Sequence, residues 1–291
     1  MDVYGLLGNP VGHSLSPPMH EAAYEACEMD ATYVTFEPDR DALGDAIRGA
    51  GSLGIAGLNV TIPFKEGAID HVEPDELAAR IGAVNTIAFP EPDAAGADDR
   101  DAVARPTGHN TDAAGAVRAL RERGFADRDD SLDGATAVVV GAGGAGRAIA
   151  FGLAEAGATV RVVNRTVERA TSLASEVPDA SGHGLDGLPT LLAGATVLVN
   201  ATSVGMESDE SIVPTEALHE DLVVMDAVYR PRETRLLRDA TAAGATAVDG
   251  TWMLLYQGAA AFERWTGRDA PVAAMGQALR SSFEGNSDQE R

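Results

Sequence analysis

Lysine is almost absent from this chain of 291 residues, which contains one lysine, Lys65, against 45 acidic residues. Arginine supplies nearly all of the fixed positive charge. A guanidinium stays protonated at working pH, so arginine can form ion pairs but cannot carry protons, whereas a lysine amine can. Retention of a single lysine therefore points to proton transfer or to a compact ammonium contact at Lys65. Chance survival is the alternative, and composition alone does not decide between them.

Basic residues of any kind are also scarce, with 22 Lys and Arg in total, a formal net charge of −23 and a sequence pI near 4.5. This excludes nucleic acid as a natural partner, because a phosphate backbone needs a basic footprint. A disordered acidic tail is excluded as well, since 45% of the residues are hydrophobic and the acids are spread along the chain. Near molar ionic strength the screening length falls to about 3 Å, so a dense negative surface stays soluble there. We therefore predict a protein adapted to high salt.

Disulfides, metal-ligand spacing and long apolar runs are missing too. Cys27 is the only cysteine, so it forms no internal disulfide, and we interpret it as a small packing residue. The six histidines show no metal-ligand spacing, so no metal is predicted. Residues 1–5 lack a basic n-region, and the longest uncharged stretch, 187–206, is interrupted by Pro189 and Asn200. We therefore expect no secretory signal, no membrane partner and a cytoplasmic location.

Strand-like and helix-like segments alternate through the first third of the chain, which predicts an α/β fold. Ser16 precedes Pro17, and we expect it to cap the first helix. An acidic stretch at 91–105 is predicted to be an exposed loop, and a domain boundary is placed near Asp112. The expected strands are 3–7, 33–36, 57–62 and 83–89, and the expected helices are 17–27, 41–50 and 75–81.

A glycine-rich motif opens the second half of the chain. The apolar strand 137–140 runs directly into Gly-Ala-Gly-Gly-Ala-Gly at 141–146, and an apolar helix is expected over 148–156. This is GxGxxG in the strand-to-helix context that it requires. Its glycines permit a tight turn and close backbone approach, so that the amides at the helix N-terminus can bind a pyrophosphate. The alternative is a plain glycine-rich turn without a ligand.

The residues after the next strand bear on which dinucleotide is bound. The polar residues that follow strand 159–163 are Asn164, Arg165, Thr166 and Arg169. An NAD site usually has an acidic residue here to hold the ribose 2′-hydroxyl, whereas arginines attract the 2′-phosphate of NADP. NADP is therefore the predicted cofactor. Solvated surface arginines are the alternative, with Glu168 as an ion-pair partner for either of them.

Further strands are expected at 196–200 and 222–225, each ending in polar loop residues. Beyond them lies a long amphipathic helix, 252–265, which follows the last Rossmann-like strand and is expected to return to the first domain. The fold class is therefore two α/β domains. The expected domains are residues 1–111 with the returning segment 251–291, and a Rossmann-like NADP-binding domain at 112–250.

Five short segments resemble the shikimate dehydrogenase family in their order and spacing. They are Gly8 to Pro17, Asn59 to Lys65, Gly82 to Thr86, Asn110 to Asp112, and Asp249–Gly250 with Gln257. The resemblance covers essentially the whole chain. It implies an enzyme that reversibly oxidises the C3 hydroxyl of shikimate to 3-dehydroshikimate with NADP, the first domain binding the substrate. In cells it would run as the reduction, a step of aromatic amino-acid biosynthesis.

Lys65 and Asp112 gain roles from this resemblance and from their own chemistry. Oxidation of an alcohol needs a hydride acceptor on one face and a proton acceptor at the oxygen, and an amine beside a carboxylate can supply the second. The resemblance implies that Lys65 is the acid/base and that Asp112 shares its hydrogen-bond network. Which of the two passes the proton stays open, and a helix cap is the alternative interpretation of Asp112.

The resemblance also implies a set of substrate-binding residues, most of them neutral hydrogen-bonding groups that suit a small polyhydroxylated carboxylate. With Lys65 and Asp112 they are Ser14, Ser16, Thr61, Asn85, Tyr229 and Gln257. The two serines resemble the hydroxyls that hold the carboxylate. Taken singly, Ser16 is more often a helix cap, Gln257 a solvated helix residue and Tyr229 a packing residue. Their co-occurrence therefore carries the inference.

On the cofactor side the resemblance implies a pyrophosphate site, an adenosine-phosphate site and contacts near the nicotinamide, with Glu76 as a further candidate. Besides Arg169, the residues are Gly141, Ala142, Gly143, Gly144, Ala145, Asn164, Arg165, Thr166, Ala227 and Gly250. The chain departs from the family pattern at Leu15, at Glu21 and at Thr251–Trp252. The last departure bears on how closely the C-terminal helix approaches the nicotinamide.

Three rival functions compete with this interpretation. A quinate/shikimate dehydrogenase that uses NAD would differ in substrate breadth and cofactor. A methylenetetrahydrofolate dehydrogenase shares the two-domain layout but gives the Ser14 and Ser16 segment no role. A catalytically silent nucleotide-binding regulator would keep 141–146 without needing Lys65 and Asp112 together. The expected partners are a small-molecule substrate and a second copy of the chain in a homodimer, without nucleic acid.

Overall fold

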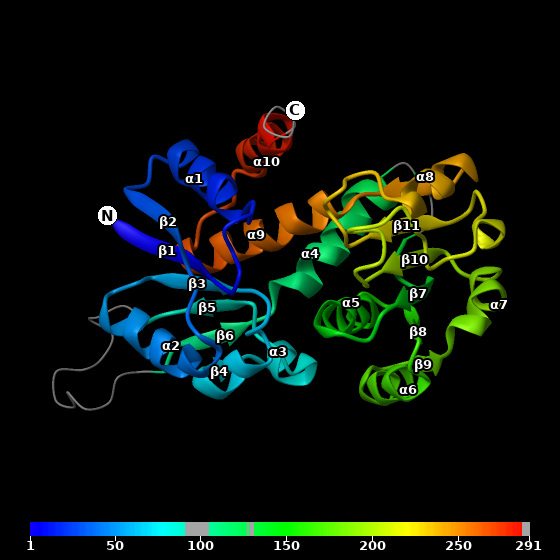
Figure 1. Ribbon diagram of the computed structural model, residues 1–291, viewed down its shortest axis with the longest axis horizontal. Helices are drawn as coiled ribbons and strands as arrows, with labels where there is room; N and C mark the ends of the chain where they lie inside the picture. Colours follow the sequence, from blue (N-terminus) through cyan, green and yellow to red (C-terminus); the bar gives the residue numbers. More distant parts are fainter. Residues whose placement is uncertain (91–104, 127, 129–130, 287–291) are drawn as a thin grey trace. The chain divides into compact units, whose positions relative to one another are not determined.

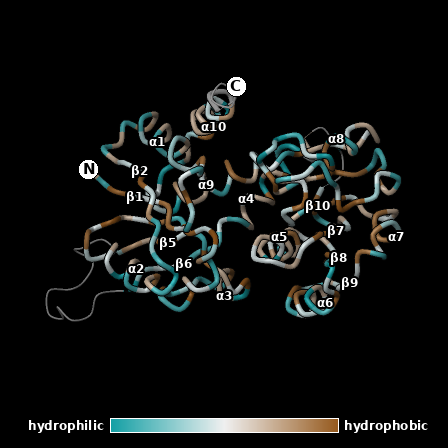
Figure 2. Tube along the Cα trace, viewed as in Figure 1, coloured by the Kyte–Doolittle hydropathy of each residue, from teal (hydrophilic) through white to brown (hydrophobic). Residues whose placement is uncertain are grey.

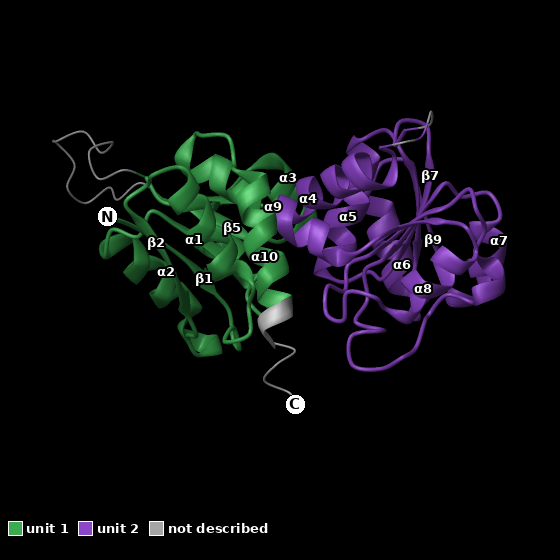
Figure 3. Ribbon diagram, turned by 90° about the horizontal axis from the view of Figure 1, so that it is seen from above, with its two compact units in different colours: residues 1–111, 258–291 green, residues 112–257 purple. Residues whose placement is uncertain are grey.

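The computed structural model describes residues 1–90, 105–126, 128 and 131–286. Two compact units divide the chain (Figure 3). Unit 1 is Met1–Thr111 with Gly258–Arg291, and unit 2 is Asp112–Gln257. The predicted exposed loop at 91–105 lies almost wholly outside the described residues.

Unit 1 contains a six-stranded mixed sheet in the order β2-β1-β3-β5-β6-β4 (Figure 1). Its strands are β1 (Asp2–Leu7), β2 (Ala31–Phe36), β3 (Gly57–Val60), β4 (Glu73–Pro74), β5 (Thr86–Ala88) and β6 (Thr107–His109). The strands β1, β2 and β3 run parallel, while β5 is antiparallel to both β3 and β6. The carboxyl ends of β1 and β3 therefore lie at one edge of the sheet, and the segments that follow them meet there.

The core of unit 1 includes Leu7, Ile47, Leu58 and Ile87, each at most 1% exposed. Several helices belong to this unit. They are α1 (Ser16–Ala26), α2 (Leu43–Ser52), α3 (Glu76–Ile81) and α10 (Val272–Asn286), together with the second half of α9 (Gly250–Thr266). Figure 2 colours the trace of each element by its hydropathy.

Two local predictions in unit 1 are wrong. Ser16 does not cap α1, because it is the first helical residue and Leu15 takes the cap position. Pro17 and Pro18 then occupy the positions whose N–H groups a cap would accept, and proline has none. The strand expected at 83–89 is shorter, covering Thr86–Ala88. The preceding amides bond to other segments, with Val84 N–H donating to the Lys65 carbonyl at 2.8 Å.

Unit 2 contains a six-stranded parallel sheet in the order β12-β11-β10-β7-β8-β9. The strands are β7 (Thr136–Val140), β8 (Thr159–Val163), β9 (Ala180–His183), β10 (Val197–Asn200), β11 (Val223–Asp226) and β12 (Thr246–Val248). Numbered from β7, this is the doubly wound order 3-2-1-4-5-6, whose topological switch point lies between β7 and β10. The Rossmann-like prediction is confirmed, and the ligand crevice is expected at the carboxyl ends of these two strands.

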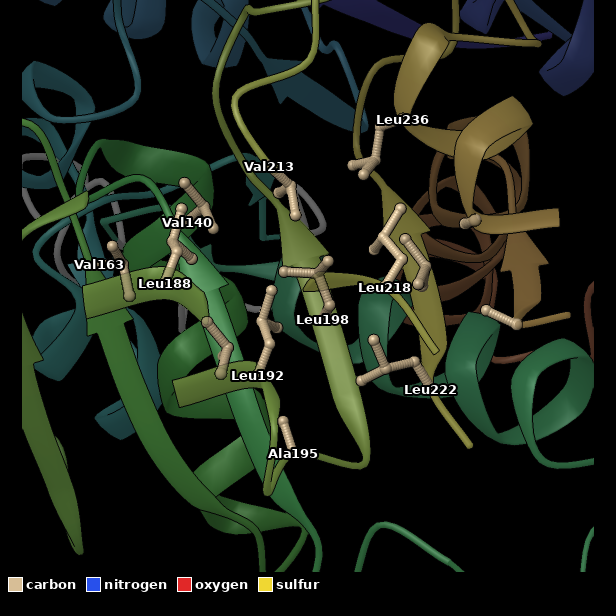
Figure 4. Close-up of a cluster of buried hydrophobic side chains, with 14 of the residues drawn as sticks. Val140, Val163, Leu188, Leu192, Ala195, Leu198, Val213, Leu218, Leu222 and Leu236 are labelled. Atoms are coloured by element: carbon tan, nitrogen blue, oxygen red, sulfur yellow. The ribbon is translucent and has the colours of Figure 1, made fainter. Parts of the chain in front are cut away.

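Helices cover both faces of the unit 2 sheet, and a cluster of buried aliphatic side chains fills one side of it (Figure 4). The helices are α4 (Thr111–Ala119), α5 (Gly144–Glu155), α6 (Val167–Glu176), α7 (Leu188–Leu192) and α8 (Arg235–Ala242), with a π-helical turn at Leu120–Gly124. The helix expected to begin at Ala148 begins at Gly144, so the second half of the glycine motif is already helical.

The helix α9 belongs to both units, because the segment of unit 1 that follows unit 2 begins at Gly258, inside the helix, whereas residue 251 was the predicted start of that segment. Its side chains show why. Tyr256 donates its hydroxyl to Glu122 Oε2 at 2.7 Å within unit 2. Further along, Trp265 donates its indole N–H to the Ile87 carbonyl at 2.9 Å and stacks on Tyr4 within unit 1. The two ends of one helix are therefore anchored to different cores.

Among the described helices, none combines the length and the apolar character needed to cross a membrane.

Candidate active site

The segments after β1 and β3 are joined to each other by backbone hydrogen bonds at one edge of the unit 1 sheet. Thr61 N–H donates to the Leu7 carbonyl at 2.9 Å, and Asn9 N–H donates to the Ile62 carbonyl at 3.1 Å. The first segment continues to Ser14 and Ser16, where the Ser16 N–H donates to Ser14 Oγ at 3.2 Å. The edge therefore collects hydroxyl groups from two loops that lie far apart in the sequence.

Lys65 ends the second of these loops. Its side chain is partly exposed, while Phe64 before it is 3% exposed and anchors the loop in the core. The Lys65 carbonyl accepts the N–H of Val84, the residue before Asn85. The backbone of the sole lysine is thus tied to the segment that carries a predicted substrate residue. The Lys65 side chain therefore projects from a short loop whose backbone is hydrogen-bonded to a neighbouring segment. Such an anchored position suits a group that must contact one particular atom of a ligand.

Asn85 is 2% exposed and connects this edge to the start of α4. Its Oδ1 accepts the backbone N–H of Thr111 at 2.7 Å and the Thr111 hydroxyl at 3.1 Å. A third donor is the Thr86 hydroxyl at 3.0 Å. Since Thr111 is followed directly by Asp112, the Asn85 side chain holds the backbone from which that carboxylate projects.

Asp112 lies in the first turn of α4 and is 6% exposed. The N-terminal end of a helix favours a negative charge, so the position suits a carboxylate. Asp112 is the first residue of unit 2, whereas Lys65 belongs to unit 1. Their expected pairing therefore stays a prediction.

The glycine-rich turn of unit 2 divides into packed and open positions. Gly141 has φ +117°, and a Cβ on it would lie 2.9 Å from the Ala201 carbonyl oxygen. A Cβ on Gly146 would lie 2.1 Å from the Gly141 carbonyl oxygen. At Gly143 and Gly144, by contrast, a Cβ would meet open space. The first pair makes the turn tight, and the second leaves backbone accessible at the start of α5, as a pyrophosphate site requires.

The polar residues predicted for the adenosine phosphate follow β8 and lead into α6. Asn164 Nδ2 donates to the Thr166 carbonyl at 3.0 Å, which fixes the bend. Arg165 and Arg169 are exposed, and within the described residues neither forms an ion pair with Glu168. Their exposure fits both a 2′-phosphate site and the alternative of solvated surface arginines, so the role of the two residues stays a prediction.

The remaining predicted residues of unit 2 gather where β11 and β12 end. Ala227 N–H donates to the Asn200 carbonyl at 2.9 Å, and a Cβ on Gly250 would lie 2.6 Å from the Val228 carbonyl oxygen. This close approach brings the loop of Ala227 and Tyr229 against the start of α9. Tyr229 is partly exposed.

The structure also describes two further predicted site residues and one residue at which the chain departs from the family pattern. Gln257, seven residues into α9, donates Nε2 to the Leu254 carbonyl at 2.9 Å. Glu76 is exposed at the first residue of α3 in unit 1, whereas the other predicted cofactor residues lie in unit 2. Trp252 is covered by the Arg123 guanidinium, 3.6 Å above its ring, and stacks on Tyr256. The unusual tryptophan is thus packed on unit 2.

Sequence reasoning assigned no role to several buried polar residues around the site. Asn59, Thr86 and Thr111 are at most 4% exposed and bond to one another or to Asn85. In unit 2, Asp226 is fully buried and accepts hydrogen bonds from Asn200, Thr234 and the Val228 N–H. The sequence did contain a signal, because several of these polar residues lie within otherwise apolar segments. Burial of a polar side chain without a hydrogen-bond partner costs free energy, so such residues are expected to bond to one another.

Comparison with protein families gives three matches along the chain. Residues 6–87 match the shikimate dehydrogenase substrate binding domain. Residues 125–229 match the family shikimate / quinate 5-dehydrogenase, and residues 250–280 match the shikimate 5′-dehydrogenase C-terminal domain.

Individual relatives agree with these matches. A shikimate dehydrogenase (NADP(+)) of Haloarcula marismortui is 64% identical over 280 residues, covering 96% of this chain and 99% of that protein. A Thermus thermophilus shikimate 5-dehydrogenase solved with NADP(H) and shikimate is 40% identical with a TM-score of 0.84, covering 97% and 100%. A Corynebacterium glutamicum quinate dehydrogenase solved with NAD is 33% identical with a TM-score of 0.84, covering 96% and 99%.

Proposed function

The chain belongs to the shikimate dehydrogenase family, and from this premise we propose that Lys65 and Asp112 perform the proton transfer of its reaction. The activity is that of an NADP-dependent shikimate dehydrogenase. The reaction interconverts 3-dehydroshikimate and shikimate, so a hydride and a proton must be delivered to the two ends of one carbonyl. The observation that carries the proposal is the place of the sole lysine. Its backbone carbonyl accepts the N–H of Val84, and the next residue, Asn85, accepts the N–H of Thr111, the residue before Asp112.

The open glycine turn and the exposed arginines fit NADP. Gly141 to Ala145 would hold the pyrophosphate, and Arg165 and Arg169 would hold the 2′-phosphate. When bound, the cofactor supplies or accepts the hydride. During reduction the Lys65 ammonium would donate its proton to the C3 oxygen as that oxygen becomes a hydroxyl. During oxidation the neutral amine would take the proton back.

The substrate residues divide by the chemistry that they meet. Ser14 and Ser16 offer hydroxyls to the carboxylate from the loop after β1. Thr61 and Asn85 would bond the ring hydroxyls, and Tyr229 and Gln257 would complete the contacts from unit 2. Groups that are neutral hydrogen-bond donors and acceptors discriminate strongly against an analogue that lacks one hydroxyl, because a site group is then left unpaired.

The test is reduction of NADP by the purified enzyme with shikimate, followed by NADPH absorbance across a KCl series. We expect turnover with shikimate and NADP, and activity and melting temperature that both rise toward molar KCl. Quinate and NAD form the comparison arms. Equal rates with quinate and NAD would favour the quinate/shikimate dehydrogenase alternative, and a flat response to KCl would contradict the salt adaptation.

Two further predictions, one on the oligomeric state and one on the location in the cell, extend this proposal. A homodimer is tested by light scattering at high KCl, where a mass of twice 30.1 kDa is expected. A cytoplasmic location is tested by fractionating the cells that make the protein, where the activity is expected in the fraction that contains other cytoplasmic enzymes.

A further inference from the structure

A buried asparagine in β3, Asn59, has only one compatible orientation. It is 4% exposed, and its Nδ2 lies 3.4 Å from the Asn85 carbonyl oxygen and 3.2 Å from the Thr86 hydroxyl. A carbonyl oxygen can only accept, so the amide nitrogen must face it. The Asn59 Oδ1 then faces Tyr33, whose hydroxyl donates to it at 2.7 Å.

The same reasoning fixes the amide of Asn85. A backbone N–H can only donate, so the atom of Asn85 that lies 2.7 Å from the Thr111 nitrogen is its oxygen. The hydroxyls of Thr86 and Thr111 converge on that oxygen as well. With Oδ1 committed to these donors, any contact of the Asn85 side chain with a substrate is made by Nδ2 as a donor.

The hydrogen bonds between these residues run in one consistent direction. The Tyr33 hydroxyl donates to Asn59 Oδ1, the amide Nδ2 of Asn59 donates to the Thr86 hydroxyl, and the Thr86 hydroxyl donates to Asn85 Oδ1. Each hydroxyl has a single proton, so reversing one link would leave two donors or two acceptors facing each other. A chain of this kind is strengthened by mutual polarisation in a buried environment.

Tyr33 is held firmly at the start of this chain. Its ring is 5% exposed and stacks on His20 with centroids 4.5 Å apart and planes 1° from parallel. Its backbone N–H donates to Glu21 Oε1 at 2.5 Å. Burial raises the pKa of the Tyr33 hydroxyl well above its ordinary value, opposed by a hydrogen bond with the Ser16 side chain. Tyr33 therefore stays protonated and able to donate, between two predicted substrate residues.

We propose that Tyr33, Asn59 and Thr86 are positioning residues that hold the Asn85 amide with its nitrogen as the substrate-facing donor. The inference rests on the proposed role of Asn85 in binding shikimate. It adds that the position of Asn85, whose amide the Thr111 N–H orients, is supported by a phenol on β2 through two intervening side chains, Asn59 and Thr86. Removal of the phenol hydroxyl leaves the buried Asn59 oxygen unpaired, so Asn59 and the Thr86 hydroxyl that it contacts are held less firmly against Asn85.

The chain offers a matched control for Tyr33→Phe. Tyr24 is 1% exposed and belongs to the same aromatic cluster, but its hydroxyl is buried without a hydrogen-bond partner among the described residues. Tyr33→Phe is expected to raise the KM for shikimate about tenfold with kcat changed much less, because an interaction made in ground and transition states alike is weakened. Tyr24→Phe is expected to leave both constants unchanged, and the KM for NADP is expected to stay constant in both variants.

A second series separates positioning from general support of the fold. Thr86→Val is expected to raise the shikimate KM as Tyr33→Phe does, and Thr86→Ser, which keeps the hydroxyl, is expected to restore it. In an Asn85→Ala background, Tyr33→Phe is expected to have no further effect on the shikimate KM. An equal effect in both backgrounds would show that Tyr33 acts independently of Asn85 and would overturn the inference.

The outcomes also distinguish this inference from the proposed function. Wild-type enzyme that turns over shikimate, with Asn85→Ala impaired and Tyr33→Phe unimpaired, would overturn the inference and leave the proposed function standing. Wild-type enzyme without activity on shikimate would overturn both.

Discussion

The two units differ in how their predicted site residues are held. In unit 1, buried side chains bond to one another, from Tyr33 through Asn59 and Thr86 to Asn85 and Thr111. In unit 2, the glycine-rich turn works through its backbone, and its important property is the absence of side chains at Gly141 and Gly146. One part of the site is therefore sensitive to the loss of a polar atom, and the other to the gain of a carbon atom.

This difference follows from what each unit is proposed to bind. A small polyol is recognised by individual hydrogen bonds, each of which needs a partner with fixed orientation. A pyrophosphate is recognised by several backbone amides at a helix N-terminus, and these are placed by the fold itself. Substitutions in the two units should therefore fail in different ways, which the following predictions test from the largest expected effect to the smallest.

Among the residues of unit 1, Lys65 is expected to tolerate substitution least. Lys65→Ala is expected to lower kcat by about 10² or more, because the proton at the substrate oxygen loses its carrier. Lys65→Arg keeps the positive charge but offers a group that does not release a proton, so it is expected to be similarly slow. Steady-state rates and the Kd for NADPH measured by fluorescence provide the test, with the Kd expected to stay near the wild-type value. An active Lys65→Arg enzyme would reassign the acid/base.

Gly146 and Gly143 test whether unit 2 depends on its backbone. In Gly146→Ala the new methyl meets a carbonyl oxygen at 2.1 Å, which must shift the turn at an expected cost of about 1–3 kcal/mol in the free energy of unfolding. Gly143→Ala points its methyl into open space, so its stability is expected to match the wild type. Chemical unfolding at constant KCl measures the first effect.

NADPH binding separates the same two variants in a second way. If the open space at Gly143 receives the pyrophosphate, Gly143→Ala weakens NADPH binding without loss of stability. Unchanged NADPH binding and unchanged stability in Gly143→Ala would remove that position from the cofactor site.

These contrasts also explain how much of the molecule could be predicted from sequence. The unit 2 motif was recognisable because its determinants are contiguous, from strand 137–140 through the glycines to α5. The hydrogen-bond network in unit 1 could not be recognised in this way. Tyr33 and Asn59 are separated by 26 positions, and each resembles an ordinary strand residue. Register, which local patterns do not encode, decides which polar side chains meet.

Elements that were missed share a physical cause. The strands β9 and β12 have few buried residues, and their pairing is set by neighbours that the local sequence does not specify. The Ser16 prediction failed because Pro17 was taken as the first helical residue, whereas α1 already begins at Ser16 and Leu15 takes the cap position. The prediction of Lys65 as the acid/base rests on composition and family resemblance, and it stays a prediction until the variants are measured.

Arg165 and Arg169 test a side-chain contribution to cofactor binding that is expected in unit 2. Both are exposed and lie at the start of α6, where they can meet a 2′-phosphate. Arg165→Ala is expected to raise the KM for NADP about tenfold, the usual size of a lost charge-assisted hydrogen bond, and to leave the KM for NAD unchanged. Arg161 and Arg268 are not suitable controls, because they bond the Leu191 and Cys27 carbonyls. The control is Arg40→Ala, an exposed arginine of unit 1. Equal losses with both cofactors would contradict 2′-phosphate binding.

Asp226 is the exception in unit 2, a buried carboxylate within a side-chain network like that of unit 1. Burial raises its pKa, opposed by hydrogen bonds from Thr234, the Val228 N–H and Asn200. A raised carboxyl pKa in the folded state means that the ionised group costs stability at neutral pH, and that this cost disappears as the pH falls below the pKa of the unfolded chain. Asp226→Asn keeps an oxygen for two of the three donors and removes the charge.

The Asp226→Asn variant is therefore expected to be as stable as the wild type at pH 7 or more stable, by about 1 kcal/mol, with the difference shrinking as the pH is lowered toward 4. Urea unfolding at constant KCl across this pH range measures it. A variant that is much less stable at every pH would mean that the third donor, the Thr234 hydroxyl, needs a carboxylate oxygen. Unit 2 would then depend on oriented side-chain acceptors as strongly as unit 1 does, and the contrast between the units would be confined to the glycine turn.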